Sequence, residues 1–300
     1  MPLTISVITP SYNQGRFIER TIQSVLSQDI PALEYLVCDG GSTDETVEIL
    51  RSYENRLRWV SELDEGQGDA VNKGILNTSG DIIGWLNSDD IYYPGVLGLV
   101  LDFFEQNPTV DVVYGNANHI DEQDSVLEPY YTETWNYERL KEVCYLCQPA
   151  VFFRRRIVEA KGLLDPTLQY CMDYEYWLRL GANTRFIRLN EILAGSRLYD
   201  SNKTLGSRVA VHREIIEMTQ KRLGQTPQRW IFNYAHSVVE TKGIQRQTTS
   251  GKIKFLTLLI TISTLAFLRW YHYVPREAIR LMWSWTAPPL YRTVQKWVHL

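Results

Sequence analysis

The chain has 300 residues, of which 44% are hydrophobic and 22% are charged, and its formal net charge is −4. These values exclude disorder over most of the length, and they are sufficient for one large core with an appendage or for two small domains. Four cysteines, with no signal peptide at the start, do not make a disulfide framework, so we expect a reducing, cytoplasmic setting. Cys144 and Cys147 form one CxxC pair without a second pair or a histidine pair, and we interpret them as structural rather than as zinc ligands.

The charge is divided unevenly along the chain. Residues 1–200 contain 16 Lys and Arg against 31 Asp and Glu, whereas residues 201–300 contain 15 against 4. Such a split predicts two parts that face different partners. The acidic part can hold a metal ion and the basic part can lie against anionic lipid, and we expect no nucleic-acid partner.

Strand and helix patterns alternate in the N-terminal part of the chain. Buried strands are predicted at 3–9, 34–38, 57–62 and 81–87, and helices at 17–27 and 68–77. A further helix is predicted after Ser42, which can serve as its N-cap while Glu45 closes a capping box. This order predicts an α/β fold with a mostly parallel sheet and helices on both faces.

Sheets of this kind bind ligands beyond the carboxyl ends of their strands. The rule makes residues 10–13, 39–42 and 88–90 neighbours across one crevice. Asp89 and Asp90 end a buried strand side by side, and adjacent carboxylates raise each other's pKa unless a positive group meets them. Mg²⁺ or Mn²⁺ is the simplest partner, because a hard cation prefers carboxylate oxygen and keeps positions open for phosphate. The alternative is that the aspartates cap a helix opened by Pro94.

Five segments together resemble the family 2 glycosyltransferases, which are inverting enzymes with the GT-A (Rossmann-like) fold. They are SVITPSYN at 6–13, VCDGGSTDET at 37–46, EGQGDAVNKG at 65–74, GDIIGWLNSDD at 80–90 and MDYEYWLR at 172–179. Five linked motifs in order are far more specific than any single motif. The resemblance covers residues 3–205, and it implies a catalytic domain at 1–205 followed by a basic, aromatic-rich helical extension at 206–300.

The resemblance also implies roles for individual residues. Asp90 would bind the metal ion that bridges the donor phosphates, and Asp173 would be the catalytic base. The nucleotide-sugar donor would be bound by Pro10, Ser11, Tyr12, Asp39, Asn72, Lys73, Ser88 and Asp89. Contacts with the acceptor or the sugar are expected from Gln148, Trp177 and Arg197. Simpler interpretations stay open: Lys73 as an exposed helix residue, Asp173 as a helix N-cap, and Trp177 as a core residue.

Two positions depart from the family pattern. Met172 stands where many relatives have Glu, and Tyr199 stands where relatives often have His. Loss of that His removes one contact with the metal or the phosphate. Arg197 and Lys203 can still offset the charge of the diphosphate.

These roles imply a single displacement with inversion. Asp173 would take the proton of an acceptor hydroxyl, while a cation at Asp90 neutralises the leaving nucleoside diphosphate. We expect a UDP-sugar as donor and a saccharide or glycolipid of cell-surface assembly as acceptor. One alternative is a nucleotidyltransferase, but residues 9–15 lack the Gly-rich, basic signature of those enzymes. The other is a non-catalytic carbohydrate- or membrane-binding module, which would not need Asp90 and Asp173 together.

The basic tail contains an uncharged run at 255–268 with Lys252, Lys254 and Arg269 at its flanks. A membrane span needs about 20 apolar residues, so the run alone is too short to cross a bilayer. Basic flanks and nearby aromatic residues are typical of a membrane-surface segment, and Trp283, Trp285 and Trp297 continue the pattern. We expect peripheral attachment to the cytoplasmic face of a membrane. The alternative is a buried helix of a helical subdomain.

Overall fold

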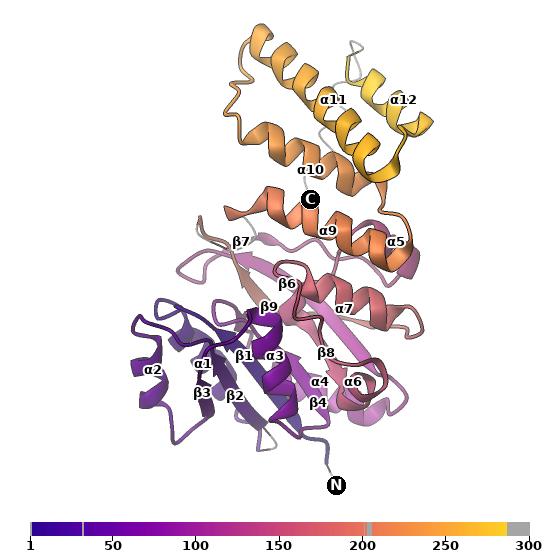
Figure 1. Ribbon diagram of the computed structural model, residues 1–300. Helices are drawn as coiled ribbons and strands as arrows, with labels where there is room; N and C mark the ends of the chain where they lie inside the picture. The colour runs from indigo at the N-terminus through magenta and orange to yellow at the C-terminus, as the bar shows by residue number, and fades with distance from the viewer. Residues whose placement is uncertain (1, 32, 201, 203–205, 287–300) are drawn as a thin grey trace. The chain divides into compact units, whose positions relative to one another are not determined.

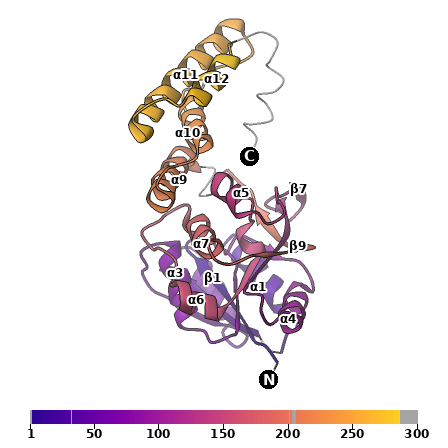
Figure 2. The same cartoon turned by 90° about the vertical axis from the view of Figure 1, so that its right-hand side faces the viewer.

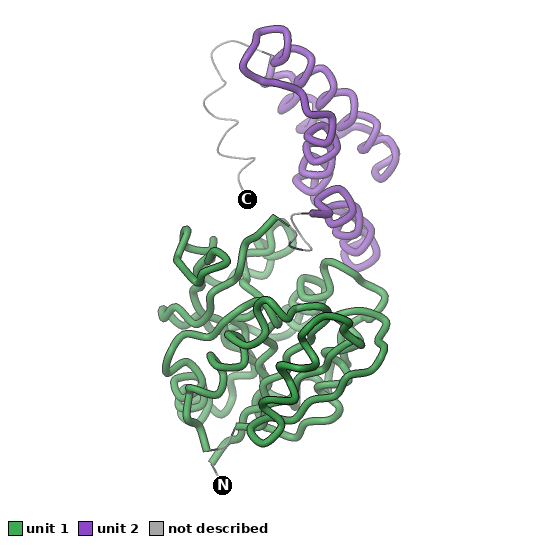
Figure 3. The backbone as a smooth tube through the Cα atoms, turned by 90° about the vertical axis from the view of Figure 1, so that its left-hand side faces the viewer, with its two compact units in different colours: residues 1–200 green, residues 201–300 purple. Residues whose placement is uncertain are grey.

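The computed structural model describes residues 2–31, 33–200, 202 and 206–286. The chain forms two compact units, residues 1–200 and residues 201–300 (Figure 3).

The described residues of the first unit form one sheet of nine strands (Figure 1). The strands are β1 Ile5–Ser11, β2 Leu33–Asp39, β3 Arg58–Ser61, β4 Ile82–Trp85, β5 Ile91–Tyr92, β6 Val112–Ile120, β7 Val126–Pro129, β8 Val151–Arg154 and β9 Ile187–Arg197. Their order is β3-β2-β1-β4-β8-β6-β9-β5, with β7 paired to β6.

The sheet has a parallel part and a mixed part. Strands β3, β2, β1 and β4 are mutually parallel, while β8 runs antiparallel to both β4 and β6. The predicted mostly parallel sheet is therefore confirmed for the first four strands of the chain. In the parallel part, Ser11 pairs with Asp39 and Asp39 pairs with Ser61, so these residues form one row at the carboxyl edge.

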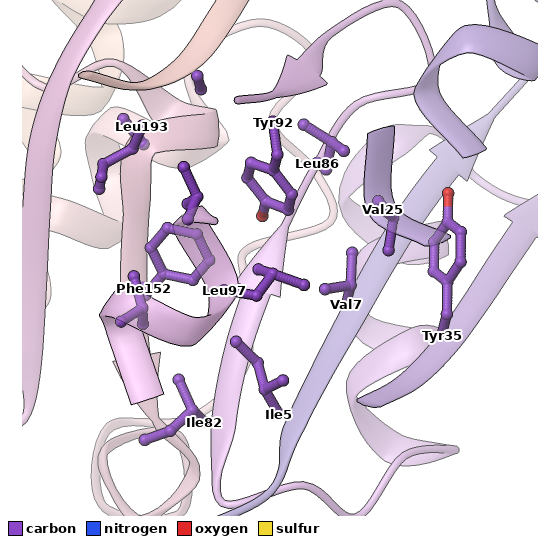
Figure 4. Packing of buried hydrophobic residues seen from close by; sticks show 14 of the residues in the cluster. Ile5, Val7, Val25, Tyr35, Ile82, Leu86, Tyr92, Leu97, Phe152 and Leu193 are labelled. Atoms are coloured by element: carbon purple, nitrogen blue, oxygen red, sulfur yellow. The ribbon is translucent and has the colours of Figure 1, made fainter. Parts of the chain in front are cut away.

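Helices cover both faces of this sheet (Figure 2). They are α1 Ile18–Leu26, α2 Thr46–Ser52, α3 Gln67–Leu76, α4 Val96–Gln106, α5 Tyr137–Glu142, α6 Arg155–Lys161 and α7 Met172–Gly181. Because strand side chains alternate, Ile5 and Val7 of β1 enter the larger core with α1 and α4, as Figure 4 shows. Ile8 points the other way, where α3 packs so closely that a Cβ on Gly74 would lie 2.2 Å from its Cγ2.

The expected capping box is wrong. Helix α2 begins at Thr46 with Glu45 as its N-cap; the side chain of Glu45 makes no capping hydrogen bond, and Oδ1 of Asp44 accepts one from the backbone N of Thr46 at 3.0 Å. Ser42 instead donates its hydroxyl to Asp39 and accepts a hydrogen bond from the backbone N of Asn13. The Ser42 hydroxyl, which the local sequence predicted to cap the helix, therefore joins the loops that follow β1 and β2.

The second unit contains α9 Arg208–Leu223, α10 Gln228–Glu240, α11 Thr249–Tyr271 and α12 Arg276–Ser284. Its core is built by residues of the last three of these helices: Ala235, Val239, Phe255, Leu259, Met282 and Trp285. The uncharged run lies inside α11, which has 23 residues and is, by length and composition, the one described helix that could cross a membrane. Trp297 lies outside the described residues.

Candidate active site

The row at the carboxyl edge is organised around Asp39, which is only 2% exposed. Its Oδ2 accepts hydrogen bonds from the backbone N of Gly41 (3.2 Å), the backbone N of Ser42 (2.9 Å) and the hydroxyl of Ser61 (2.6 Å). Asp39 therefore holds the loop after β2 and the end of β3 in one arrangement. The contact of Asp39 with the base of a nucleotide stays a prediction.

The loop after β1 is joined to this row as the strand-end rule predicts. Asn13 has a φ of +51°, which is the left-handed region, and its side-chain Oδ1 accepts a hydrogen bond from the backbone N of Thr43 at 2.9 Å. Pro10 and Ser11 are buried in β1, whereas the ring of Tyr12 is 60% exposed. An exposed aromatic ring beside a fixed polar row is suited to cover a flat heterocycle.

The two predicted donor residues of α3 are both engaged within the protein. The side-chain amide of Asn72 donates to the backbone O of Leu164 and accepts from its backbone N, each at 3.0 Å. The Lys73 ammonium contacts Glu62 at 3.2 Å and Asp69 at 3.3 Å. Asn72 therefore fixes the segment at Leu164 to α3, and the Lys73 ammonium is paired with two carboxylates. The contacts of Asn72 and Lys73 with a nucleotide-sugar donor stay predictions.

The backbone of the 88–90 segment is anchored to α1. The hydroxyl of Thr21 donates to the backbone O of Ser88 at 2.9 Å and to the backbone O of Asp90 at 2.7 Å. Helix α4 begins at Val96 with Gly95 as its N-cap and without a side-chain cap. The alternative that the two aspartates cap a helix is therefore excluded.

One oxygen of each aspartate is held by the end of β9 and the residues after it. The backbone N of Arg197 donates to Oδ1 of Asp90 at 2.9 Å, and the hydroxyl of Tyr199 donates to Oδ2 of Asp89 at 2.8 Å. Burial raises the pKa of both carboxyl groups, and for Asp90 the charge of Asp89 adds to this effect. The pair is thus a site where negative charge is costly until a cation arrives.

Arg197 corrects one expectation. Its side chain is fully buried, and its guanidinium donates to the backbone O of Asp89 at 2.7 Å and of Asp121 at 2.6 Å, and pairs with Asp124 at 2.5 Å. A group enclosed in this way does not contact a sugar or a diphosphate. Arg197 instead supports the Asp89–Asp90 segment from inside the protein.

Asn87 is a part of this site that the sequence motifs did not single out. Its Oδ1 accepts hydrogen bonds from Nε1 of Trp85 (2.9 Å) and Nε2 of Gln67 (2.7 Å), which leaves its Nδ2 directed to Oδ2 of Asp90 at 3.4 Å. The only sequence signal is its place immediately before the Ser-Asp-Asp triplet.

Asp173 lies in the first turn of α7, after the N-cap residue Cys171, so it is not itself the cap. Its Oδ1 accepts a hydrogen bond from the backbone N of Tyr174 at 2.7 Å. The charges of Asp173 and Asp90 both raise the pKa of the Tyr130 phenol and of the Cys147 thiol, after burial as the main cause.

Trp177 corrects a second expectation. Its side chain is 0% exposed, and its ring lies 6.0 Å from that of Phe153 and 6.3 Å from that of Phe186. A ring without exposed surface does not stack on a sugar. Trp177 packs α7 onto the sheet and so fixes the helix that carries Asp173.

Gln148 lies in a 3₁₀ turn, Gln148–Ala150, and is 8% exposed. Its Nε2 donates to the backbone O of Trp85 at 2.5 Å, whereas its buried Oε1 has no hydrogen-bond partner among the described residues. The contact of Gln148 with the acceptor or the sugar stays a prediction. Cys144 and Cys147 are free thiols. Among the described residues, no group of three or more His, Cys, Asp or Glu side chains is arranged so that it could hold a metal ion.

A sheet of this order with paired aspartates beyond the carboxyl edge defines the GT-A class of fold. The solved structures with this architecture include S. aureus TarS 1-349 in complex with UDP-GlcNAc, at a TM-score of 0.61 and 17% identity over 99% of this chain and 88% of that one. Another is a mannosyltransferase from Pyrobaculum calidifontis in complex with GDP-Man and Mn²⁺, at a TM-score of 0.56 and 17% identity over 99% and 84% of the two chains. These likenesses concern the fold.

Sequence similarity identifies the family. Residues 6–160 match the model of glycosyl transferase family 2, and the chain belongs to that family. A chondroitin synthase from Escherichia coli is 30% identical over 257 residues, which cover 83% of this chain and 36% of the synthase. The chain thus spans about a third of that relative's length.

Proposed function

We propose that this protein transfers a sugar, with inversion, from a nucleotide-sugar donor to a hydroxyl of a saccharide or glycolipid acceptor in cell-surface polysaccharide or glycolipid assembly. A UDP-sugar is the favoured donor. The observation that carries the proposal is the Asp89–Asp90 pair at the carboxyl edge of the sheet, with one oxygen of each carboxyl group held by Tyr199 or by the backbone N of Arg197. A cation site at Asp90 and a proton acceptor at Asp173 would be the two groups that such a displacement needs.

The nucleoside would lie on the row at the carboxyl edge. Asp39 and Ser61 are held together there, and the exposed ring of Tyr12 stands beside them. TarS 1-349 is in complex with UDP-GlcNAc, and the similar relatives include a chondroitin synthase; together they favour a UDP-sugar. Because the mannosyltransferase is in complex with GDP-Man, a GDP-sugar is the alternative donor.

The donor set at Asp89 and Asp90 fits a divalent metal. Mg²⁺ and Mn²⁺ take one or two carboxylates from the protein and fill their other positions with phosphate oxygens and water, so a third acidic side chain is not required. Asp90 would hold the ion, and Asp89 would face the ribose or the sugar. When bound, the metal supplies Lewis-acid stabilisation of the charge that develops on the leaving diphosphate. The Mn²⁺ in the mannosyltransferase complex supports this choice.

Asp173 would accept the proton of the attacking hydroxyl. Its position in the first turn of α7, fixed by the buried Trp177, gives the carboxylate a constant place relative to the sheet. The acceptor hydroxyl would attack from the side of Asp173, and the nucleoside diphosphate would leave toward the cation site. Such a single displacement inverts the configuration at the anomeric carbon. Gln148 would then accept a hydrogen bond from a sugar hydroxyl.

The second unit would hold the enzyme at the cytoplasmic face of an anionic membrane. Its 15 basic residues against 4 acidic ones, and the apolar helix α11, support this proposal. Such a position would bring the active site to lipid-linked acceptors.

Release of the nucleotide tests the proposed chemistry. The protein is incubated with a panel of UDP- and GDP-sugars and, in parallel reactions, with sugar phosphates and UTP or GTP. Each reaction contains Mn²⁺ or a chelator, and nucleoside diphosphate and pyrophosphate are both measured. We expect metal-dependent release of a nucleoside diphosphate. Formation of pyrophosphate from a sugar phosphate and a nucleoside triphosphate would identify a nucleotidyltransferase, and binding without any release would identify a non-catalytic module.

A further inference from the structure

Helix α12 has an inner face that packs in the core of the second unit. Ala278 is fully buried, and Met282 is 6% exposed and accepts a weak hydrogen bond from Thr264 of α11. This packing means that α12 is a formed part of the unit and presents a fixed outer surface.

The outer face of α12 carries arginine and large apolar side chains together. Arg276, Ile279, Arg280 and Trp283 follow the spacing i, i+3, i+4 and i+7, which places them on one side of a helix. All four are exposed, and Trp283 is exposed by 75%. A tryptophan this exposed is a costly surface residue in water unless something apolar covers it.

Helix α11 shows the opposite arrangement. Its large apolar residues Phe255, Leu259 and Phe267 face the core of the unit, while Lys254, Thr257 and Thr261 are exposed. Only 28% of the apolar 18-residue window of α11 is buried, and Leu265 and Leu268 are exposed near the end of the uncharged run. Part of the apolar surface of α11 is therefore used in the core, and its exposed end is the competing membrane surface.

We propose that the outer face of α12 is the surface that binds anionic phospholipid. Trp283 and Ile279 would enter the boundary between headgroups and acyl chains, and Arg276 and Arg280 would pair with lipid phosphates. A second copy of this chain is a poor occupant of this face, because two such basic faces repel each other. The inference gives a surface to the membrane contact proposed above and rests on that proposal, but it does not depend on the catalytic roles.

The test is sedimentation of the full chain with vesicles of phosphatidylcholine alone or mixed with phosphatidylglycerol, at low and at high salt. We expect the double variant Arg276→Gln, Arg280→Gln to reduce partition onto the mixed vesicles about 30-fold, which corresponds to about 1 kcal/mol for each arginine. The double variant Ile279→Ser, Trp283→Ser should lose the binding that survives high salt, since that part is apolar rather than electrostatic.

Matched variants separate this surface from general charge and from α11. Arg213→Gln with Lys242→Gln removes the same charge from exposed positions elsewhere in the unit and should bind nearly as the parent does. Leu265→Ser with Leu268→Ser, on the exposed end of α11, should also keep binding. Nucleotide release in the absence of vesicles should be equal in all variants, which shows that each one is folded.

Three results would overturn the inference. They are full binding by both α12 variants, loss of binding by the α11 variant, and resistance of the membrane-bound protein to alkaline carbonate, which would mean that α11 crosses the bilayer. A different result would separate the two proposals. If neither the parent nor any variant released nucleotide, but vesicle binding followed the expectations above, the proposed activity would be contradicted and the α12 surface would be supported.

Discussion

The hydroxyl of Tyr199 donates a hydrogen bond to Oδ2 of Asp89 at 2.8 Å across 110 positions of sequence. The ring of Tyr199 lies 4.9 Å from that of Phe17, at the start of α1, and burial raises the pKa of its phenol, so the group stays a donor at neutral pH. The resemblance to family 2 glycosyltransferases implies that Tyr199 occupies the position where relatives often have His. In this chain it holds the acidic segment by hydrogen bonding from a neutral group.

Replacement of Tyr199 by Phe should therefore weaken donor binding without removing it. A lost hydrogen bond to a charged acceptor corresponds to about 1.5–3 kcal/mol, or roughly a tenfold to hundredfold rise in KM for the nucleotide sugar. The matched control is Tyr53→Phe, because the Tyr53 hydroxyl donates to Glu19 at 3.0 Å on the surface. Equal KM values for the two variants would show that Tyr199 does not position Asp89.

Asp90 should make the metal-free protein less stable as pH rises. Its carboxyl has a pKa raised by burial and by Asp89, so the folded state holds a proton that the unfolded state releases above about pH 4. The free energy of unfolding should fall as pH increases from about 4 toward the raised pKa, and Asp90→Asn should reduce that slope. Thermal unfolding in chelator at several pH values measures the effect, and an unchanged slope in the variant would contradict it.

The same residue should control metal-dependent binding. Asp90→Ala should abolish the Mn²⁺-dependent part of nucleotide-sugar binding, because the diphosphate then meets the acidic site without a cation. Titration calorimetry with UDP, with and without Mn²⁺, measures this. A variant that binds UDP in Mn²⁺ as tightly as the parent would remove Asp90 from the site.

Asp173→Asn should separate binding from turnover. The change keeps the size of the side chain and removes its basicity, so donor affinity should stay nearly constant while kcat falls about 100-fold or more. Asp102→Asn on α4 is the matched control at a position outside the site. Turnover of the Asp173 variant equal to that of the control would rule out the base.

Asn72→Ala tests whether α3 contributes structure or donor contact. Its two hydrogen bonds to Leu164 are buried, so their loss should lower the free energy of unfolding by about 1–3 kcal/mol. With a structural role, the KM for the donor should change little at a temperature where the variant is folded. A large rise in KM at unchanged stability would support the predicted contact with the donor.

The sequence predicted the parallel part of the fold well, because apolar runs and helical spacing are local signals. The predicted strand at 81–87 is observed as β4 Ile82–Trp85, and the rule on strand ends correctly joined residues 10–13 to 39–42. Sequence patterns could not reveal that Ser42 is used by Asp39, since that contact depends on the loop that β2 forms at the sheet edge.

The errors at Arg197 and Trp177 have a common physical reason. Both residue types bind sugars or phosphates when exposed, and the motifs carry no information on exposure. Arg197 is buried because backbone oxygens of Asp89 and Asp121 come together only in the folded sheet. Trp177 is buried because Phe153 of β8 and Phe186, immediately before β9, pack against its ring in the folded protein.

The most direct test of the central claim is the configuration of the first sugar released. Proton NMR follows the protein with Mn²⁺ and the UDP-α-sugar that gives the fastest UDP release, with water as the acceptor, before the free sugar equilibrates between anomers. An inverting displacement assisted by Asp173 and a cation at Asp90 predicts that the β-anomer appears first, and that neither anomer forms above background in Asp173→Asn. Initial release of the α-anomer, or of no UDP from any sugar nucleotide in the panel, would contradict the proposed function.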